Sequence, residues 1–259
     1  MKAIVIIPTY NERENIVKLI PRVLGLGLDL EILVVDDNSP DGTARLVEKL
    51  AQEFPKVHLL ERQKKLGLGS AYIAGFKWAL ARDYEAVLEM DADFSHCPRY
   101  VQKFLNLIQN FDVIVGSRWM KGGKVINWAL WRFFLSRLAN IYTQWVMGPQ
   151  VHDWTGGFTC YRRRFLESLD LDAVRSDGYG FQIEMKYLAV KNGFSLMEFP
   201  IQFANRTVGD SKISRHIVFE AFFLVWILRF KHLFAANKPK KKESSEIPEQ
   251  IKEPTSLNV

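Results

Sequence analysis

The first half of the chain alternates between short apolar runs and longer segments of mixed polarity. The apolar runs are rich in β-branched residues and occupy residues 2–7, 30–35, 57–61, 86–90 and 112–116. Runs of this kind are typical of strands that are buried on both faces of a parallel sheet. The segments between them have helical spacing and cover residues 16–24, 43–53, 71–81 and 98–109. This alternation predicts an α/β fold, with a mostly parallel sheet flanked by helices.

Acidic residues follow two of the predicted strands at the point where each strand ends. Asp91 and Asp93 come after the fourth run, and Asp36 and Asp37 come after the second. Residues i and i+2 of an extended segment point to the same side, so Asp91 and Asp93 can face one cation or one phosphate-bearing ligand. Ligands of open α/β sheets bind outside the carboxyl ends of the strands, and carboxylates suit Mg²⁺ or Mn²⁺ beside substrate phosphates. The sequence therefore predicts a metal or phosphate site at this edge of the sheet.

Part of this acidic region also suits a structural role. Asp36, Asn38 and Asp41 can shape a turn and cap the next helix, whereas Asp37 can accept hydrogen bonds from ribose hydroxyls or from a base edge. The glycines of the loop at 64–70 either cradle a phosphate or, in the interpretation we favour, let the backbone pack closely beside the strand ends. No Gly-x-Gly-x-x-Gly motif follows the first strand, which argues against a dinucleotide-dependent dehydrogenase.

Composition narrows the choice of partners. The chain has 259 residues, 48% of them hydrophobic and 25% charged, which is enough for one large or two small domains with a core. Its net charge of +6 favours anionic partners, among which charge alone does not choose. Cys97 and Cys160 lack metal-ligand spacing, so we expect free thiols in a reducing compartment. The N-terminal apolar stretch is too short for a secretory signal.

Two segments of the second half combine apolar, aromatic and basic residues. Residues 127–147 place tryptophans and arginines at helical spacing, which suits the membrane boundary, with a core helix as the alternative. Residues 217–228 are more apolar and flanked by basic residues, but they are too few for a span of ~20 residues. We expect both to be interfacial amphipathic helices. The polar composition of residues 236–259 predicts a disordered tail. The predicted domain is 1–235, with interfacial helices at about 128–147 and 215–235.

Several motifs stand in a characteristic order along the chain. They are Pro8-Thr-Tyr-Asn-Glu12, Val35-Asp-Asp37 with Ser39-Pro-Asp-Gly-Thr43, Asp91-Ala-Asp93 with Ser95-His96, Gly116-Ser-Arg118, Asp153-Trp-Thr-Gly-Gly157, Gly180-Phe-Gln-Ile-Glu-Met185 and Arg206 with Gly209-Asp-Ser-Lys212. In this order they resemble the family 2 glycosyltransferases and, more narrowly, the polyprenol- or dolichol-phosphate mannosyltransferases. The match covers roughly residues 2–232, and collinear motifs are far more specific than any one of them.

This resemblance implies a GT-A, Rossmann-like fold and an inverting, metal-dependent sugar transfer. The implied donor is GDP-mannose or another nucleotide sugar, the acceptor is a polyprenyl (dolichyl-type) phosphate, and the cofactor is Mg²⁺ or Mn²⁺. A polyprenyl-phosphate glucosyltransferase that uses UDP-glucose is the alternative, because such enzymes share most of these motifs. The resemblance also implies a peripheral protein on the cytoplasmic face of the membrane, with no nucleic acid as partner and with room for a separate membrane-anchoring protein.

Carried over residue by residue, the resemblance assigns roles to the matched positions. The donor nucleoside would be surrounded by Pro8, Tyr10, Glu12, Val35 and Asp37. The ribose and diphosphate would be lined by Asp91, Ala92 and Asp93. The metal would be held by Asp93, with Asp91 and Ser95 near it. The phosphates would meet Arg118, Arg206 and Lys212, and the catalytic set would be Asp93, Arg206, Lys212 and Asp153. Such a basic set is needed because donor and acceptor bring several negative charges together.

A phosphate acceptor changes what the chemistry requires. A phosphate monoester, with a second pKa of ~6, is already an anionic nucleophile at pH 7, so no dedicated base is needed. We therefore expect Asp153 to orient other groups, and we expect His96 to be a structural hydrogen-bonding residue. The loop at 205–213 carries Gly209 between Arg206 and Lys212, which predicts a lid that closes over the diphosphate.

Two other classes of protein share parts of this pattern. Phosphoryl-transfer enzymes of the haloacid-dehalogenase type also carry Asp-x-Asp after a strand. There the motif follows the first strand, whereas here three predicted strands precede it. A non-catalytic nucleotide-binding protein docked on a membrane is the remote alternative, and the presence of Asp93 and Arg206 argues against it.

Overall fold

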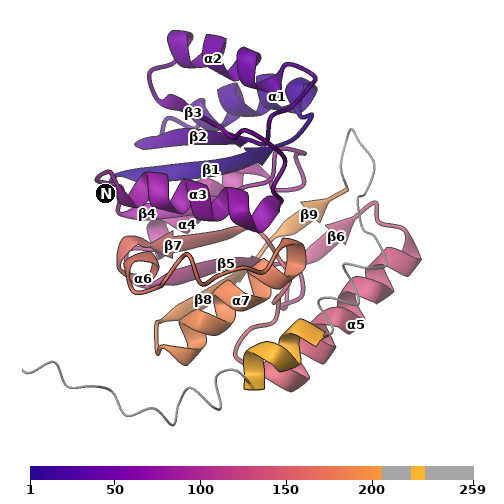
Figure 1. Ribbon diagram of the computed structural model, residues 1–259. Helices are drawn as coiled ribbons and strands as arrows, with labels where there is room; N and C mark the ends of the chain where they lie inside the picture. The colour runs from indigo at the N-terminus through magenta and orange to yellow at the C-terminus, as the bar shows by residue number, and fades with distance from the viewer. Residues whose placement is uncertain (206–222, 231–259) are drawn as a thin grey trace, which may run out of the picture.

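One sheet forms the centre of the molecule. The computed structural model describes residues 1–205 and 223–230. In that part of the chain, seven strands pair in the order β3-β2-β1-β4-β7-β5-β8 (Figure 1). They are β1 (Ala3–Thr9), β2 (Leu30–Asp36), β3 (Val57–Glu61), β4 (Ala86–Glu89), β5 (Val113–Ser117), β7 (Thr159–Arg162) and β8 (Leu196–Pro200). β7 runs antiparallel to β4 and β5, and the other adjacent strands are parallel. The predicted mostly parallel sheet is confirmed.

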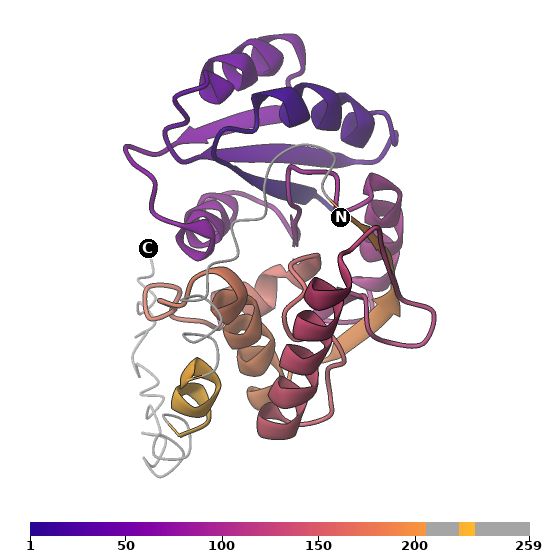
Figure 2. The same cartoon turned by 90° about the vertical axis from the view of Figure 1, so that its right-hand side faces the viewer.

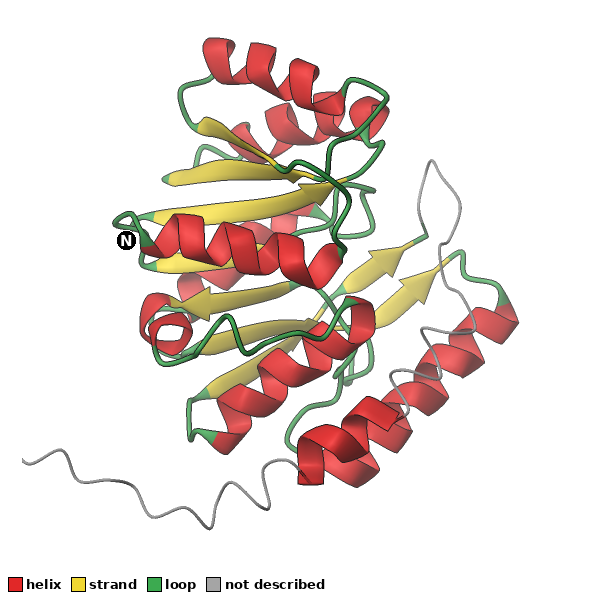
Figure 3. Ribbon diagram, in the orientation of Figure 1, coloured by secondary structure: helices red, strands yellow, loops and turns green. Residues whose placement is uncertain are grey.

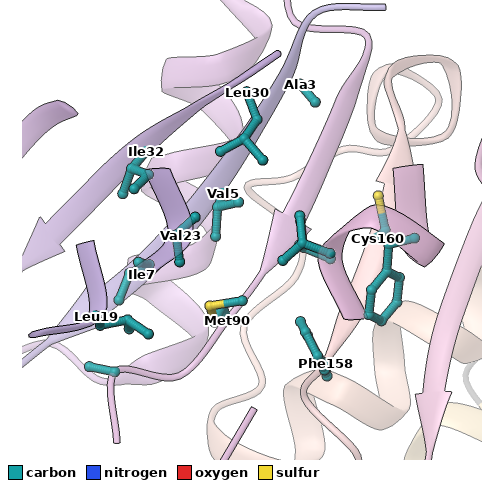
Figure 4. Packing of buried hydrophobic residues seen from close by; sticks show 14 of the residues in the cluster. Ala3, Val5, Ile7, Leu19, Val23, Leu30, Ile32, Met90, Phe158 and Cys160 are labelled. Carbon is teal, nitrogen blue, oxygen red and sulfur yellow. The ribbon is translucent and has the colours of Figure 1, made fainter. Parts of the chain in front are cut away.

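Helices cover both faces of the sheet (Figure 3). They are α1 (Arg13–Leu24), α2 (Thr43–Glu53), α3 (Leu68–Leu80), η1 (Pro98–Tyr100), α4 (Val101–Leu107), α6 (Arg163–Glu167) and α7 (Gly178–Lys191). Ala3, Val5 and Ile7 of β1 belong to the apolar cluster under α1, α2 and α4 (Figure 4). Ile4 and Ile6 point to the other face, where α3, α6 and α7 pack. Because β1 is buried on both faces, its apolar run is continuous instead of alternating.

The parallel register brings the ends of β1, β2 and β4 to one edge of the sheet. Thr9, the last residue of β1, is paired with Asp36 in β2, and Ile6 is paired with Glu89, the last residue of β4. The segments that leave these three strands therefore emerge side by side. This is the edge at which open α/β sheets bind their ligands.

A second layer flanks the end of the sheet that carries β8. β6 (Lys124–Ile126) and β9 (Gln202–Ala204) form a separate parallel pair, and α5 (Leu130–Met147) follows β6. Figure 2 looks onto this layer, with α5 as the crimson helix at the front. Residues 223–230 are helical, and their Val225 and Leu228 join an apolar cluster with α5 and α7. The ring centres of Trp145 and Trp226 lie 6.0 Å apart across this contact.

The boundaries of most early elements match the predicted ones, and α2 and β3 have the predicted bounds. The helix expected at 98–109 begins as a 3₁₀ turn, and its α-helical part ends at Leu107. The inserted strand β7 was not predicted, because its residues Thr-Cys-Tyr-Arg lack a continuous apolar run. The predicted tail at 236–259 and the proposed domain end at 235 lie outside the described residues.

Candidate active site

A cavity of about 480 Å³ opens at the carboxyl edge of the sheet. Its lining comes from the segments after β1, β2 and β4, from the loop before β7 and from the start of α7. A cavity of this size suits a ligand as large as a nucleotide. Of the predicted site residues, the lining contains Pro8, Tyr10, Glu12, Asp37, Asp91, Ala92, Asp93, Ser95 and Arg118.

Asp91 and Asp93 leave β4 in a tight loop that His96 holds in place. His96 is buried, and its Nδ1 accepts a hydrogen bond of 3.0 Å from the backbone N–H of Asp91. Its ring stacks on Phe158 with centroids 4.5 Å apart, and burial lowers the pKa of the imidazole. Asp93 Oδ1 accepts a hydrogen bond of 3.0 Å from the backbone N–H of Ser95. His96 is therefore the structural hydrogen-bonding residue that we expected.

Asp37 organises the loop at one end of the cavity. Its Oδ1 forms an ion pair with Arg62 at 2.7 Å. Its Oδ2 accepts hydrogen bonds from the backbone N–H groups of Leu66 and Gly67, at 3.0 and 3.2 Å. Asp37 thus lines the cavity and also fixes the backbone of the loop at 64–70.

Close packing explains a glycine of this loop. The backbone N–H of Gly69 donates a hydrogen bond of 2.7 Å to Asp177 Oδ1, just before α7. A Cβ added at Gly69 would lie 2.4 Å from the carbonyl oxygen of Ser176, so a side chain does not fit. Gly69 therefore packs closely, but against the segment before α7 and not against a strand end as expected.

Arg118 reaches the cavity from the end of β5 with its guanidinium already fixed. Its Nε and Nη2 each donate a hydrogen bond of 2.7 Å to Asp153, and Nη2 also donates to Thr155 Oγ1 at 2.9 Å. Burial alone would raise the pKa of Asp153, but the charge of Arg118 brings it below its usual value. Asp153 lies behind Arg118, does not line the cavity, and orients the guanidinium.

A buried polar group lies behind the loop that carries Asp91. Gln182 of α7 lines the cavity, and its Nε2 donates a hydrogen bond of 2.8 Å to Glu89 Oε2. Lys186 Nζ donates to the carbonyl oxygens of Trp154 and Gly156 at 3.1 and 2.5 Å, which fixes the loop before β7. Burial raises the pKa of Glu89 to about 8 and lowers the pKa of Lys186 to about 8.

Two further basic residues line the cavity, and the sequence motifs did not assign either to the site. Lys65 Nζ lies 4.0 Å from the ring centre of Tyr10. The guanidinium of Arg132 lies 4.2 Å from the ring centre of Trp128, and it donates a hydrogen bond of 2.9 Å to Asn205 Oδ1. Arg132 belongs to the first turn of α5, so the cavity extends to that helix. In the sequence, Arg132 stood out only because it lies in a segment rich in aromatic residues.

Four predicted site residues are not part of the observed lining. Val35 is buried in the apolar core beneath α3, and Asp153 lies behind Arg118. Arg206 and Lys212 lie outside the described residues, as does the predicted lid apart from Asn205.

Comparison with known proteins assigns the family. Residues 4–170 match the family model described as Glycosyl transferase family 2. This chain is a family 2 glycosyltransferase. It is 47% identical over 232 residues to the polyprenol monophosphomannose synthase of Mycolicibacterium smegmatis, covering 88% of each chain. It is 42% identical over 221 residues to the undecaprenyl-phosphate mannosyltransferase of Micrococcus luteus, covering 85% of this chain and 91% of that one.

Solved structures show that the glycosyltransferase has a GT-A-like fold. Glucosyl-3-phosphoglycerate synthase from Mycobacterium tuberculosis, in complex with Mn²⁺, UDP and phosphoglyceric acid, matches 88% of this chain and 78% of its own. That match has a TM-score of 0.66 and 15% identity. A mannosyltransferase from Pyrobaculum calidifontis, in complex with GDP-Man and Mn²⁺, matches 90% of this chain and 74% of its own, with a TM-score of 0.54 and 17% identity. At these identities the likeness concerns the fold alone.

The glycosyltransferase exposes an unusual set of residues on α5. All the exposed side chains of this helix are apolar, and we call them the apolar face: Leu130, Trp131, Phe134, Leu138, Ile141 and Trp145. The neighbouring helix adds Phe223, Ile227 and Phe230, which are also exposed. Contiguous apolar surface of this kind is typical of interaction sites. α5 is therefore not the core helix that the sequence left as an alternative. Within the described ranges, no helix is long and apolar enough to cross a membrane.

Proposed function

We propose that this glycosyltransferase transfers mannose from GDP-mannose to the phosphate of a membrane-borne polyprenyl, dolichyl-type phosphate, with inversion at the anomeric carbon. The observation that carries the proposal is a single cavity that extends from the acidic strand ends to the first turn of α5, whose exposed face is apolar. The names of the two relatives, at 47% and 42% identity, support both mannose and a lipid phosphate.

The order of the strands suggests how the nucleotide sugar is oriented along the cavity. Tyr10 and Asp37 follow β1 and β2, Asp91 and Asp93 follow β4, and Gly157 precedes β7. These strands are neighbours in the order β2-β1-β4-β7. A nucleoside at the end near Tyr10 and Asp37 would have its diphosphate near Asp93 and its sugar near Gly157.

The residues after β4 fit a divalent metal ion. Ser95 Oγ is buried and has no hydrogen-bond partner within the described ranges. In the same part of the chain, no group of three or more His, Cys, Asp and Glu side chains is arranged to hold a metal. Mg²⁺ or Mn²⁺ needs no such group, because these ions commonly bind through one or two carboxylates and the substrate phosphates. Asp93, Asp91 and Ser95 would hold the ion, and its charge would offset that of the leaving diphosphate.

Arg118 and Arg132 are the described cations best suited to the acceptor phosphate. Both line the cavity, and Arg132 lies on the helix that carries the apolar face. A phosphate oxygen of the acceptor attacks the anomeric carbon, and the bond from that carbon to GDP breaks, so that GDP leaves with the electron pair. The attacking oxygen is already ionised at pH 7, so Asp153 need only keep Arg118 oriented. Arg206 and Lys212 are proposed to add charge from outside the described residues.

The apolar face of α5 is proposed to lie in the membrane interface on the cytoplasmic side. Exposed tryptophan and phenylalanine rings suit the boundary between head groups and acyl chains. This placement would bring a lipid phosphate to the cavity beside Arg132, while the nucleotide end stays in water. The protein would then be peripheral.

A panel of donors tests the proposal. Purified protein with Mg²⁺ or Mn²⁺ and a short polyprenyl phosphate is given GDP-mannose, UDP-glucose or UDP-N-acetylglucosamine, and the lipid product is measured. We expect product from GDP-mannose at a rate at least ~10-fold above either other donor, because the donor contacts are fitted to one nucleotide and sugar. Preference for UDP-glucose would make the enzyme a glucosyltransferase, and nucleotide binding without any product would make it a binding protein.

A further inference from the structure

Gln182 presents a half-paired amide to the cavity. Its side chain is 2% exposed and lines the cavity, and its Nε2 donates to Glu89 Oε2 at 2.8 Å. Its carbonyl oxygen Oε1 is buried and has no hydrogen-bond partner in the described part of the chain. Buried acceptors of this kind are rare because each one is costly, and those in a binding cavity are commonly paired by the ligand. A ligand group placed opposite Oε1 would have to donate a hydrogen bond.

The chemistry of this oxygen selects among the parts of the substrates. An amide oxygen is only an acceptor, and phosphate oxygens at neutral pH are acceptors as well. The diphosphate of the donor and the phosphate of the lipid therefore cannot pair with Oε1. Hydroxyl groups of the ribose and of the transferred sugar can pair with it, and so can the N–H groups of the guanine base.

The position of Gln182 decides between the nucleoside and the transferred sugar. A Cβ added at Gly157 would lie 3.6 Å from Gln182 Nε2 and 3.7 Å from His96 Cε1, so these three residues form one patch of wall. The patch lies toward β7, beyond the loop after β4, whereas the cavity wall after β1 and β2 carries Tyr10 and Asp37. With the nucleoside at that opposite end, the hydroxyl beside Gln182 belongs to the transferred sugar.

We propose that Gln182 Oε1 accepts a hydrogen bond from one hydroxyl of the transferred hexose, and that Glu89 is the positioning residue that holds the amide in this orientation. The inference rests on the proposed function, since it takes a hexose to be the group transferred. Glu89 acts by accepting a hydrogen bond from the amide N–H, which fixes the orientation of the amide plane. Without Glu89 the amide can rotate and offer its N–H to the sugar instead.

Donor analogues that each lack one hydroxyl of mannose test this assignment. For wild type, Gln182→Met and Glu89→Met, we would measure both kcat/KM for transfer and, without acceptor, the Kd of each GDP-linked analogue. For wild type, one analogue should have an affinity and a kcat/KM roughly 5- to 100-fold below those of GDP-mannose, because that analogue leaves Oε1 unpaired. We call this loss the penalty. Gln182→Met should bind GDP-mannose more weakly and treat this analogue like the parent. Glu89→Met should lose most of the discrimination although it keeps Gln182.

Two more variants control for damage to the fold. Gln144→Met removes a glutamine of α5 that does not line the cavity, and it should keep the wild-type penalty for every analogue. Gly157→Ala leaves Gln182 and Glu89 intact, and its added Cβ makes ordinary contacts beside the amide. This variant should fold normally, and it should weaken the binding of GDP-mannose more than it weakens the binding of the penalised analogue. Wild-type penalties retained in both Gln182→Met and Gly157→Ala would overturn the assignment.

The binding arm separates this inference from the proposed function. Suppose that the analogue penalty depends on Gln182 but no sugar is transferred to polyprenyl phosphate. This result would refute the proposed reaction and leave the assignment of Gln182 standing. A protein that transfers mannose with penalties that ignore Gln182 refutes the assignment and keeps the reaction.

Discussion

Asp93 and Asp153 are two buried carboxylates of the same site with different surroundings. Asp93 lines the cavity next to Ser95, whose hydroxyl oxygen is buried without a partner in the described ranges. Asp153 has both oxygens on the guanidinium of Arg118 and lies outside the cavity lining. The first is thus suited to hold an ion with the substrate, and the second to hold another side chain.

Asp93→Asn should lower kcat/KM for sugar transfer by roughly 100-fold or more, since an uncharged amide replaces the carboxylate ligand of the metal. The thermal midpoint should change little by comparison. Asp83→Asn, at an exposed position before β4, is the matched control and should have wild-type activity. An Asp93→Asn enzyme with near-normal turnover at saturating Mg²⁺ or Mn²⁺ would remove Asp93 from the site.

Asp153→Asn should destabilise the protein by roughly 3–5 kcal/mol at pH 7, because it leaves the buried charge of Arg118 without its partner. The pKa of Asp153 is lower in the folded protein than its usual value of 3.8. Its contribution is therefore fully present above pH 3.8 and is lost as the pH falls through the folded pKa. Urea unfolding from pH 7 down to pH 3 should show a constant difference between wild type and variant above pH 3.8 and a difference that begins to shrink below it. A difference that stays constant over this range would contradict the assigned ion pair.

At the scale of elements, α5 joins the apolar face to the cavity. Its exposed side is the apolar face, and its buried side carries Asn140, whose Nδ2 donates a hydrogen bond of 2.9 Å to Thr155 Oγ1. The same Thr155 oxygen accepts a hydrogen bond from Arg118. A displacement of α5 at a lipid surface would therefore shift Thr155 and, through it, the hydrogen bond to Arg118.

Leu138→Glu should reduce binding to anionic vesicles at least about 10-fold, because it puts a charge in the middle of the apolar face. Sedimentation with phosphatidylglycerol vesicles measures this, and alkaline carbonate should release the bound wild type. Val17→Glu on α1 is the control, since Val17 is also exposed and apolar but lies on another part of the protein. Equal loss in both variants would mean that the apolar face is not the membrane contact.

The sequence predicts those elements whose signal is local. The strands β1 to β5 are continuous apolar runs, and Asp91 and Asp93 stand out because they follow such a run. β7 has no such run, since it depends on pairing with β4 and β5, which lie far from it in the chain. Lys65 and Arg132 were missed as cavity residues because only tertiary packing brings them there. Val35 sits within a matched motif, yet its side chain is in the core.

At the scale of the whole molecule, the strand order would keep the two proposed substrates apart. The proposed nucleotide end of the cavity is lined by residues after β1 and β2, whereas the apolar face belongs to α5. This helix lies toward the opposite end of the sheet, next to β6 (Figures 1 and 2). The proposed reaction needs this arrangement, since GDP-mannose comes from water and the acceptor phosphate from a lipid surface. The two would meet in the cavity.

The most direct test compares one donor with two acceptors. Transfer from GDP-mannose is measured to a short, water-soluble polyprenyl phosphate and to a long polyprenyl phosphate in vesicles, for wild type, Asp93→Asn and Leu138→Glu. We predict that wild type uses both acceptors, that Asp93→Asn loses both, and that Leu138→Glu keeps the soluble acceptor but loses about 10-fold or more on the vesicle-bound one. Near-normal activity of Asp93→Asn on either acceptor, or equal activity of Leu138→Glu and wild type on vesicles, would contradict the account.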